Sequence, residues 1–306
     1  MSEQLFDTHV VKMQKEKDSD LKALFELWEK AHGIEIDEMF DKFGNKDISK
    51  EEFEKEIYKK KGNTISSHFT QFFEKQCNNK KCPQAKEHGK KAWEIALKKA
   101  FNKDGTYKNY DIKEGGYRYI CLLKEANDSK KMCINDYLAH SNVVNEWIVN
   151  DGQGVCGRKY KSDMLNKLNE AFYKLFGDEN CGESEENFDF KNKVAFVNVN
   201  KRGGTSVTAG RDETAVIEYA KRYKEFILKE IEILTEHEKA TVFVCGSKNY
   251  FERLMIAFFG KEVKGEIEDN KENRVLSKNK ITFKQIPHPS YWKVTSTGLM
   301  KAMQKG

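Results

Sequence analysis

The stretch ATVFVCGSKNYFERLMIAFFG, residues 240–260, decides the fold class of this chain. It begins with a continuous apolar run, ATVFVCGS, which is typical of a strand covered on both faces. NYFERLMIAFFG (249–260) then places apolar residues at helical spacing. A buried strand that leads directly into a helix is the repeating unit of a parallel α/β sheet.

The same unit recurs along the chain. Three further runs predict strands, namely YRYICLLK (117–124), KVAFVNVNK (193–201) and ITFKQI (281–286). Helical patterns lie between them, at SDMLNKLNEAFYKLF (162–176) and TAVIEYAKRYKEFILKEIEIL (214–234). This alternation predicts an α/β fold, with a four-stranded parallel sheet that is flanked by helices and joined by right-handed crossovers.

The N-terminal part of the chain has a different character. DLKALFELWEKAHGIEIDEMF (20–40) carries apolar residues at helical spacing, and the pattern returns in EEFEKEIYKK (51–60) and KKAWEIALKKAF (90–101). Strand-like runs appear only after this part. We therefore expect a helical N-terminal region at residues 1–105, followed by an α/β domain at residues 106–306.

Composition narrows the class of protein. Of the 306 residues, 38% are apolar and 34% are charged, and the net charge is +5. The chain has no run of about 18 apolar residues and no apolar N-terminal segment, so we expect a cytoplasmic monomer that is not bound to a membrane. The mild positive charge is weak support for a nucleic-acid partner. The lysine-rich stretch 75–103 is either a solvated helix face or a surface that follows phosphates.

Seven cysteines in a chain without an export signal predict free thiols or a metal site rather than disulfides. Cys77 and Cys82, with His88 nearby, are the candidate start of a metal site, with zinc and an iron–sulfur cluster as equal alternatives. Residues 41–52, DKFGNKDISKEE, resemble a calcium-binding loop only in part. Lys46 stands where the sharp turn needs glycine, so we expect no calcium there.

Polar residues follow the predicted strands. KEAND (124–128) ends the first strand, VNVNKRGG (197–204) the second and CGS (245–247) the third. After the fourth, Pro287 and Pro289 flank His288 and fix the backbone on both sides of it. Ligands of such sheets bind beyond the carboxyl ends of the strands. A carboxylate, amides and an imidazole there can move protons and read the edge of a heterocycle. The candidates are Glu125, Asn127, Asp128, Asn198, Asn200, Lys201 and His288.

Taken in order, these runs resemble the uracil-DNA glycosylase superfamily over roughly residues 115–306. LLKEAN (122–127) is similar to the Gly-Glu-Ala-Pro motif of its iron–sulfur branch, with Lys124 in place of glycine and Asn127 in place of proline. VAFVNVNK is similar to that branch's strand ending in Asn-Val-Val-Lys, and TVFVCGS to its apolar strand ending in glycine. HPS (288–290) matches the second motif of the superfamily residue for residue. The altered first motif bears on which base is accepted, because that turn shapes the floor of the pocket.

The resemblance implies a role for each position. Glu125 would orient water or stabilise the sugar cation, with Asn127 beside it, and His288 would donate to the base oxygen that gathers charge. Asn198 would bind the edge of the base. Tyr137 would stack under the base, a place for which Trp147 and Tyr160 compete. The other substrate-binding residues that the resemblance implies are Lys201, Gly246, Ser290 and Tyr291. Ser290 would bind phosphate. Tyr291, with Trp292 as the alternative, would enter the gap that the flipped base leaves in the DNA strand.

The implied activity is that of a monofunctional DNA glycosylase. It would flip uracil or a modified pyrimidine out of DNA and hydrolyse the N-glycosidic bond, with the N-terminal region contacting the DNA. No cofactor is required, although Cys156 and Cys181 would join Cys77 and Cys82 in a structural iron–sulfur cluster like that of the branch. DNA repair is the implied setting, and phage defence a second one, since some members act on hypermodified phage DNA. A catalytically silent nucleic-acid-binding relative and an enzyme acting on free nucleotides remain alternatives.

Overall fold

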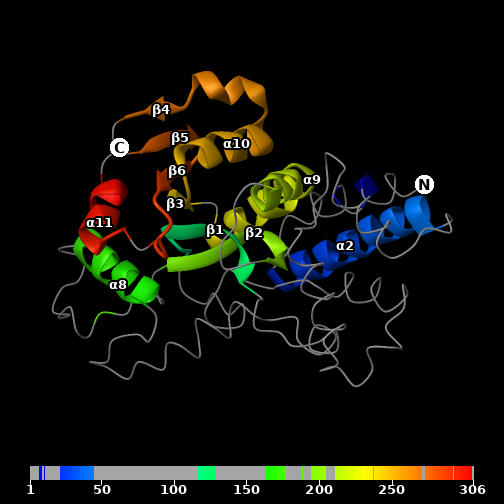
Figure 1. The fold of residues 1–306 in the computed structure, drawn as a ribbon, viewed down its shortest axis with the longest axis horizontal. Helices are drawn as coiled ribbons and strands as arrows, with labels where there is room; N and C mark the ends of the chain where they lie inside the picture. Colours follow the sequence, from blue (N-terminus) through cyan, green and yellow to red (C-terminus); the bar gives the residue numbers. More distant parts are fainter. Residues whose placement is uncertain are drawn as a thin grey trace. The chain divides into compact units, whose positions relative to one another are not determined.

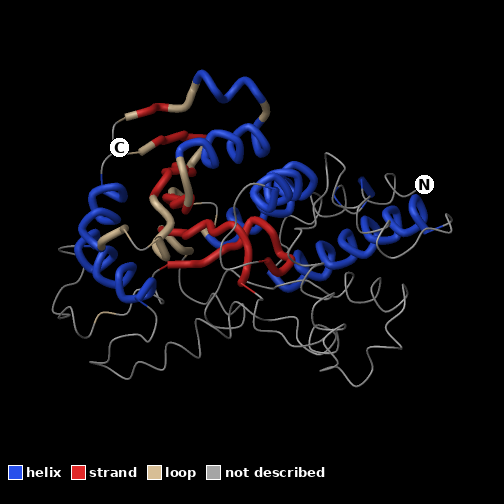
Figure 2. The backbone as a smooth tube through the Cα atoms, in the orientation of Figure 1, coloured by secondary structure: helices blue, strands red, loops and turns tan. Residues whose placement is uncertain are grey.

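The computed structural model describes residues 7, 8, 10, 21–44, 116–127, 163–176, 188, 194–204, 211–236, 238–270, 273–291 and 293–304. Helices and strands alternate along these ranges as far as residue 259, and three consecutive strands then precede the last helix (Figure 1, Figure 2). The strands are β1 (Tyr119–Asn127), β2 (Val194–Gly204), β3 (Ala240–Cys245), β4 (Glu268–Asp269), β5 (Arg274–Lys278) and β6 (Ile281–Ile286). The helices are α2 (Leu21–Gly44), α8 (Asp163–Phe176), α9 (Arg211–Leu234), α10 (Lys248–Phe259), the 3-10 helix η3 (Lys261–Gly265) and α11 (Ser296–Gln304).

The strands form one six-stranded, mostly parallel sheet in the order β2-β1-β3-β6-β5-β4. β1 is parallel to β3, with Cys121 opposite Phe243, and β3 is parallel to β6, with Val244 opposite Gln285. The α/β class is therefore confirmed. The prediction of four parallel strands is wrong in one respect, because β5 and β4 extend the sheet beyond β6. β5 is antiparallel to β6, and β4 is antiparallel to β5.

The additional strands are joined to the parallel sheet by a tight hairpin. Lys278 of β5 is opposite Ile281 of β6, so only residues 279 and 280 make the turn. Asn279 has φ +54°, a left-handed conformation that asparagine tolerates better than most residues. β5 buries only a short apolar pair, Val275 and Leu276, and the exposed β4 buries none, so neither strand forms a continuous apolar run.

Helices cover both faces of the parallel part of the sheet, as the uninterrupted apolar strands predict. On one face the ring of Phe172 in α8 lies 5.8 Å from that of Phe243. On the other face Phe259 of α10 lies 5.5 Å from Phe283 of β6. α11 packs beside α8 (Figure 1).

Two side chains from the sheet region bind the end of α11, where helix carbonyls lack partners within the helix. Lys284 Nζ donates to the carbonyl of Met303 at 2.9 Å, and Asn273 Nδ2 donates to that of Ala302 at 2.8 Å. Both side chains are buried. The desolvation that comes with this position lowers the pKa of Lys284.

The chain divides into two compact units. One comprises Met1–Lys103, Glu125–Val144 and Val199–Glu230, and the other Asp104–Lys124, Asn145–Asn198 and Ile231–Gly306. Within the first unit, α2 packs on α9. Trp28 is fully buried, with its ring 5.4 Å from Phe226, and Glu35 accepts a hydrogen bond from Arg202 Nη2 at 2.7 Å and another from the Tyr223 hydroxyl.

Candidate functional site

In the second unit, β3 lies between β6 and the part of β1 that ends at Lys124. Leu122 of β1 is opposite Val244 of β3, and β3 pairs with β6 along its whole length. Lys124 and Gly246, each two residues further on, therefore reach the same edge of the sheet. His288 follows the end of β6 at that edge. The structure thus brings together three of the strand ends that the sequence singled out.

Gly246 allows the ring of Tyr250 to lie against the end of β3. A Cβ at position 246 would lie 2.6 Å from Tyr250 Cδ1, which is closer than real contacts allow. Tyr250 belongs to the first turn of α10, where its backbone N–H donates to the hydroxyl of the N-cap residue Ser247 at 3.1 Å. The Lys124 Nζ lies 4.6 Å from the centre of the Tyr250 ring, within the range of a cation–π contact.

His288 is held by Ser290. The Ser290 hydroxyl lies 2.7 Å from His288 Nδ1, and the Ser290 backbone N–H donates to the same nitrogen at 3.3 Å. Because a backbone N–H can only donate, Nδ1 is the acceptor and the proton of a neutral ring is assigned to Nε2. No described residue hydrogen-bonds to Nε2.

The environment keeps the His288 ring neutral at neutral pH. Burial is the main cause and the nearby Lys124 ammonium the second, and together they lower the pKa of His288 from 6.5 to about 4. The residue is therefore a hydrogen-bond donor without a positive charge of its own. The positive charge at this edge is on Lys124.

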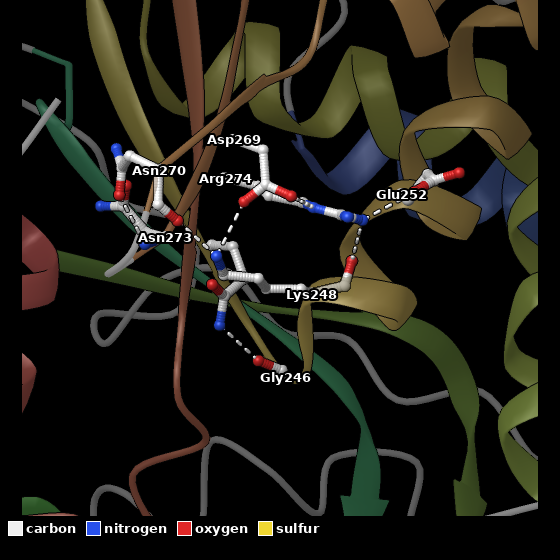
Figure 3. A network of polar contacts seen from close by, with 8 residues as sticks. Gly246, Lys248, Glu252, Asp269, Asn270, Asn273 and Arg274 are labelled. Carbon is white, nitrogen blue, oxygen red and sulfur yellow. Dashed lines mark hydrogen bonds and ion pairs between the residues drawn. The ribbon is translucent and has the colours of Figure 1, made fainter.

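Polar contacts hold the start of α10 in place (Figure 3). Gln285 Nε2 donates to the Gly246 carbonyl at 2.7 Å. Lys248 Nζ binds Asp269 Oδ1 at 2.7 Å, and Arg274 binds both Asp269 Oδ2, at 2.9 Å, and the Lys248 carbonyl, at 3.1 Å. Hydrogen bonds from Lys248 and Arg274 lower the pKa of Asp269. The turn between β3 and α10 is thus fixed to β4, β5 and β6.

Ser290 and Tyr291 lie in the turn that follows His288. The Tyr291 backbone N–H donates to the His288 carbonyl at 3.0 Å. Tyr291 has 51% of its surface exposed, and no other large apolar side chain in the described ranges is as exposed. The site therefore carries an aromatic ring at the surface, beside the histidine.

β2 places both of its predicted site residues in buried positions. Asn198 is 1% exposed. Lys201 Nζ lies 2.7 Å from Glu230 Oε2, and both side chains are 0% exposed. The role of Lys201 as a substrate-binding residue stays a prediction, but the structure gives its ammonium a partner within the first unit. Glu230 was missed, although it stands on the apolar face of the helical pattern 214–234, which is the signal that could have found it.

Several predicted residues lie outside the described part of the chain. Glu125 and Asn127 belong to β1 by their backbone, but the structure does not describe their side chains. Tyr137, Cys77 and Cys82 lie outside the described ranges, as do Cys156, Cys181 and the calcium-like residues 45–52. Their predicted roles stay predictions.

The described ranges contain no group of three or more histidine, cysteine, aspartate or glutamate side chains placed to hold a metal ion. Their two cysteines, Cys121 on β1 and Cys245 on β3, are buried free thiols. Burial raises the pKa of Cys121 well above its usual value, which makes a poor nucleophile. Among the described helices, none combines the length and the apolar character that crossing a membrane requires.

The strand ends thus combine an ammonium, a neutral imidazole with a donor at Nε2, and an exposed aromatic ring. Donors and cations of this kind stabilise an oxygen that gains negative charge during a reaction. Comparison of the chain with protein-family models, with curated proteins and with solved structures gave no match.

Proposed function

We propose that the protein is a monofunctional DNA glycosylase, which flips uracil or a modified pyrimidine out of DNA and hydrolyses its N-glycosidic bond. The observation that carries the proposal is the geometry of His288, whose Nδ1 accepts a hydrogen bond from the Ser290 backbone N–H. The imidazole is held by Ser290 at the end of β6, with its proton on Nε2, beside the ends of β1 and β3.

The topology supports a ligand at this edge. β1 lies between β2 and β3 in the sheet, so the chain leaves β1 to one side and later returns to its other side. In open α/β sheets, ligands bind outside the carboxyl ends of the strands at the point where the strand order reverses. Lys124 near the end of β1 and Gly246 after β3 mark that point.

The chemistry supports this kind of bond cleavage. Breaking an N-glycosidic bond leaves positive charge on the sugar and negative charge on the base, and both need oriented groups. A neutral Nε2–H of His288 can donate to a base oxygen in the same protonation state over the whole neutral pH range. The proposal assigns the orientation of water to Glu125 and the edge of the base to Asn198, as the resemblance implies.

The surface next to the histidine supports DNA as the substrate. A flipped base leaves a gap in the stack, which aromatic and apolar side chains can fill. Tyr291 is exposed and lies in the turn that begins at His288. An exposed aromatic ring in this turn is the kind of side chain that stacks on a neighbouring base.

The proposal is tested by measuring base release. The protein is incubated with single-stranded and duplex oligonucleotides that carry uracil, 5-hydroxymethyluracil or 5-hydroxymethylcytosine at one position. Alkali then cleaves abasic sites, and mass spectrometry identifies the released base. We expect release of at least one of these bases, with the backbone intact before alkali and with release by His288→Ala slowed by about 10²–10³-fold.

The alternatives give different results in the same assay. A catalytically silent DNA-binding relative would retain the oligonucleotides in a filter-binding measurement but produce no abasic sites. An enzyme acting on free nucleotides would release base from deoxyuridine monophosphate but not from DNA. Either result would overturn the proposal.

A further inference from the structure

Lys124 brings a positive charge to the ends of the central strands. Its ammonium lies over the ring of Tyr250, 4.6 Å from the ring centre, and Tyr250 is in the first turn of the helix that follows β3. Gly246 leaves the space that this ring occupies. The same charge acts on His288 after β6, where it contributes to the lowered pKa of the imidazole. The Lys124 ammonium, near the end of β1, therefore acts on residues that follow β3 and β6.

The proposed reaction needs a charge that His288 does not carry. When the bond between C1′ and the base nitrogen breaks, its electron pair leaves with the base, which departs as an anion. The oxygen of water forms the new bond to C1′, one water proton stays on the new hydroxyl, and the other ends on the released base. A neutral imidazole can donate a hydrogen bond to the anion but cannot balance its charge.

We infer that Lys124 stabilises the negative charge of the departing base, with Tyr250 positioning the ammonium. The inference rests on the proposed function. It does not follow from the resemblance, because the motif that LLKEAN resembles has glycine at the position of Lys124. A fixed cation near the leaving group acts where charge develops, and it needs no reorganisation during the reaction.

The test compares two leaving bases of different acidity, uracil and 5-fluorouracil, in the same oligonucleotide. Fluorine withdraws electrons, so the 5-fluorouracil anion needs less help from the protein. Lys124→Met should slow the single-turnover release of uracil about 10²-fold, but that of 5-fluorouracil about tenfold or less. Lys124→Arg keeps the charge and should restore most of the uracil rate. If Lys124→Met does not fold, Lys124→Gln should give the same difference between the two bases.

A matched control removes an exposed charge that has no part in the proposed site. Lys301→Met in α11 should leave both rates unchanged. Equal losses for the two bases after Lys124→Met would overturn the inference. If the salt dependence of DNA binding also becomes shallower by about one slope unit, the ratio of the uracil and 5-fluorouracil rates being unchanged, Lys124 is a phosphate contact instead. If the wild-type protein releases neither base, its proposed action on these bases fails first, and the inference fails with it.

Discussion

Lys201 and Glu230 form an ion pair that is closed to solvent, with Nζ 2.7 Å from Oε2 and 0% exposure of either side chain. Removing two charges from water is costly, and their mutual attraction offsets that cost only while both are present. The ring of Trp28, 5.0 Å from the Lys201 ammonium, adds a further favourable contact. The pair joins β2 to α9 within the first unit.

Breaking this pair should therefore destabilise the protein. We expect Lys201→Met to lower the free energy of unfolding by about 3–5 kcal/mol, because Glu230 is left charged and buried. The double variant Lys201→Met with Glu230→Leu should recover most of the loss. Urea unfolding measures both.

Lys174→Met is the control for this prediction. Lys174 pairs with Glu170 at 2.5 Å, but the side chains are 37% and 38% exposed, so the change should stay below about 1 kcal/mol. A Lys201→Met protein of wild-type stability and weakened DNA binding would instead make Lys201 a substrate contact.

A second prediction concerns the turn between β3 and α10. Gly246→Ala puts a methyl group 2.6 Å from Tyr250 Cδ1, so the ring must move. The free energy of unfolding should fall by about 1–3 kcal/mol, the usual cost of overpacking. Gly265→Ala is the matched control, because a Cβ there meets nothing within 4 Å, and its effect should stay within about 0.5 kcal/mol. Equal stabilities of the two variants would contradict the close approach of the Tyr250 ring.

A third prediction concerns the protonation of His288. The NMR signals of the His288 ring can be assigned by their loss in His288→Ala. They should show a neutral ring with the proton on Nε2. Their titration midpoint should be about 4. Lys124→Met should raise that midpoint, because it removes one of the two causes of the shift. A wild-type midpoint near 6.5, unchanged by Lys124→Met, would contradict the environment described for this ring.

The same shift predicts how stability depends on pH. The folded protein holds the His288 pKa below its ordinary value of 6.5, so the unfolded state binds more protons between pH 6.5 and about pH 4. The stability of the wild-type protein relative to His288→Ala should therefore decrease as the pH falls through that window, and should be constant above it. An increase on acidification would contradict the sign of the shift.

The sequence predicted the parallel strands well because three of the four are continuous apolar runs. ITFKQI was placed at the residues that form β6, and the predicted bounds of the other three parallel strands lie close to the observed ones. β5 escaped prediction because its pairing with β6 buries little of it, and the signal that remains is the short Asn279–Lys280 turn.

The site was predictable only where it depends on neighbouring residues in the chain. Pro287, His288 and Ser290 form a local unit, and the structure shows that unit as a hydrogen-bonded turn. The partners of Lys124 and Lys201 come from distant helices, so spacing along the sequence could not reveal them. Lys124 appeared in the sequence only as a departure from a motif, and its contact with Tyr250 depends on the packing of α10 on the sheet.

The single-turnover rate of base release by His288→Ala tests the central claim most directly. If His288 donates to the departing base, this rate should fall by about 10²–10³-fold, the usual loss for one such donor. The affinity for DNA and the melting temperature should stay close to those of the wild-type protein. A His288→Ala protein that releases base at the wild-type rate but melts at a clearly lower temperature would contradict the account, because His288 would then serve the fold and not the reaction.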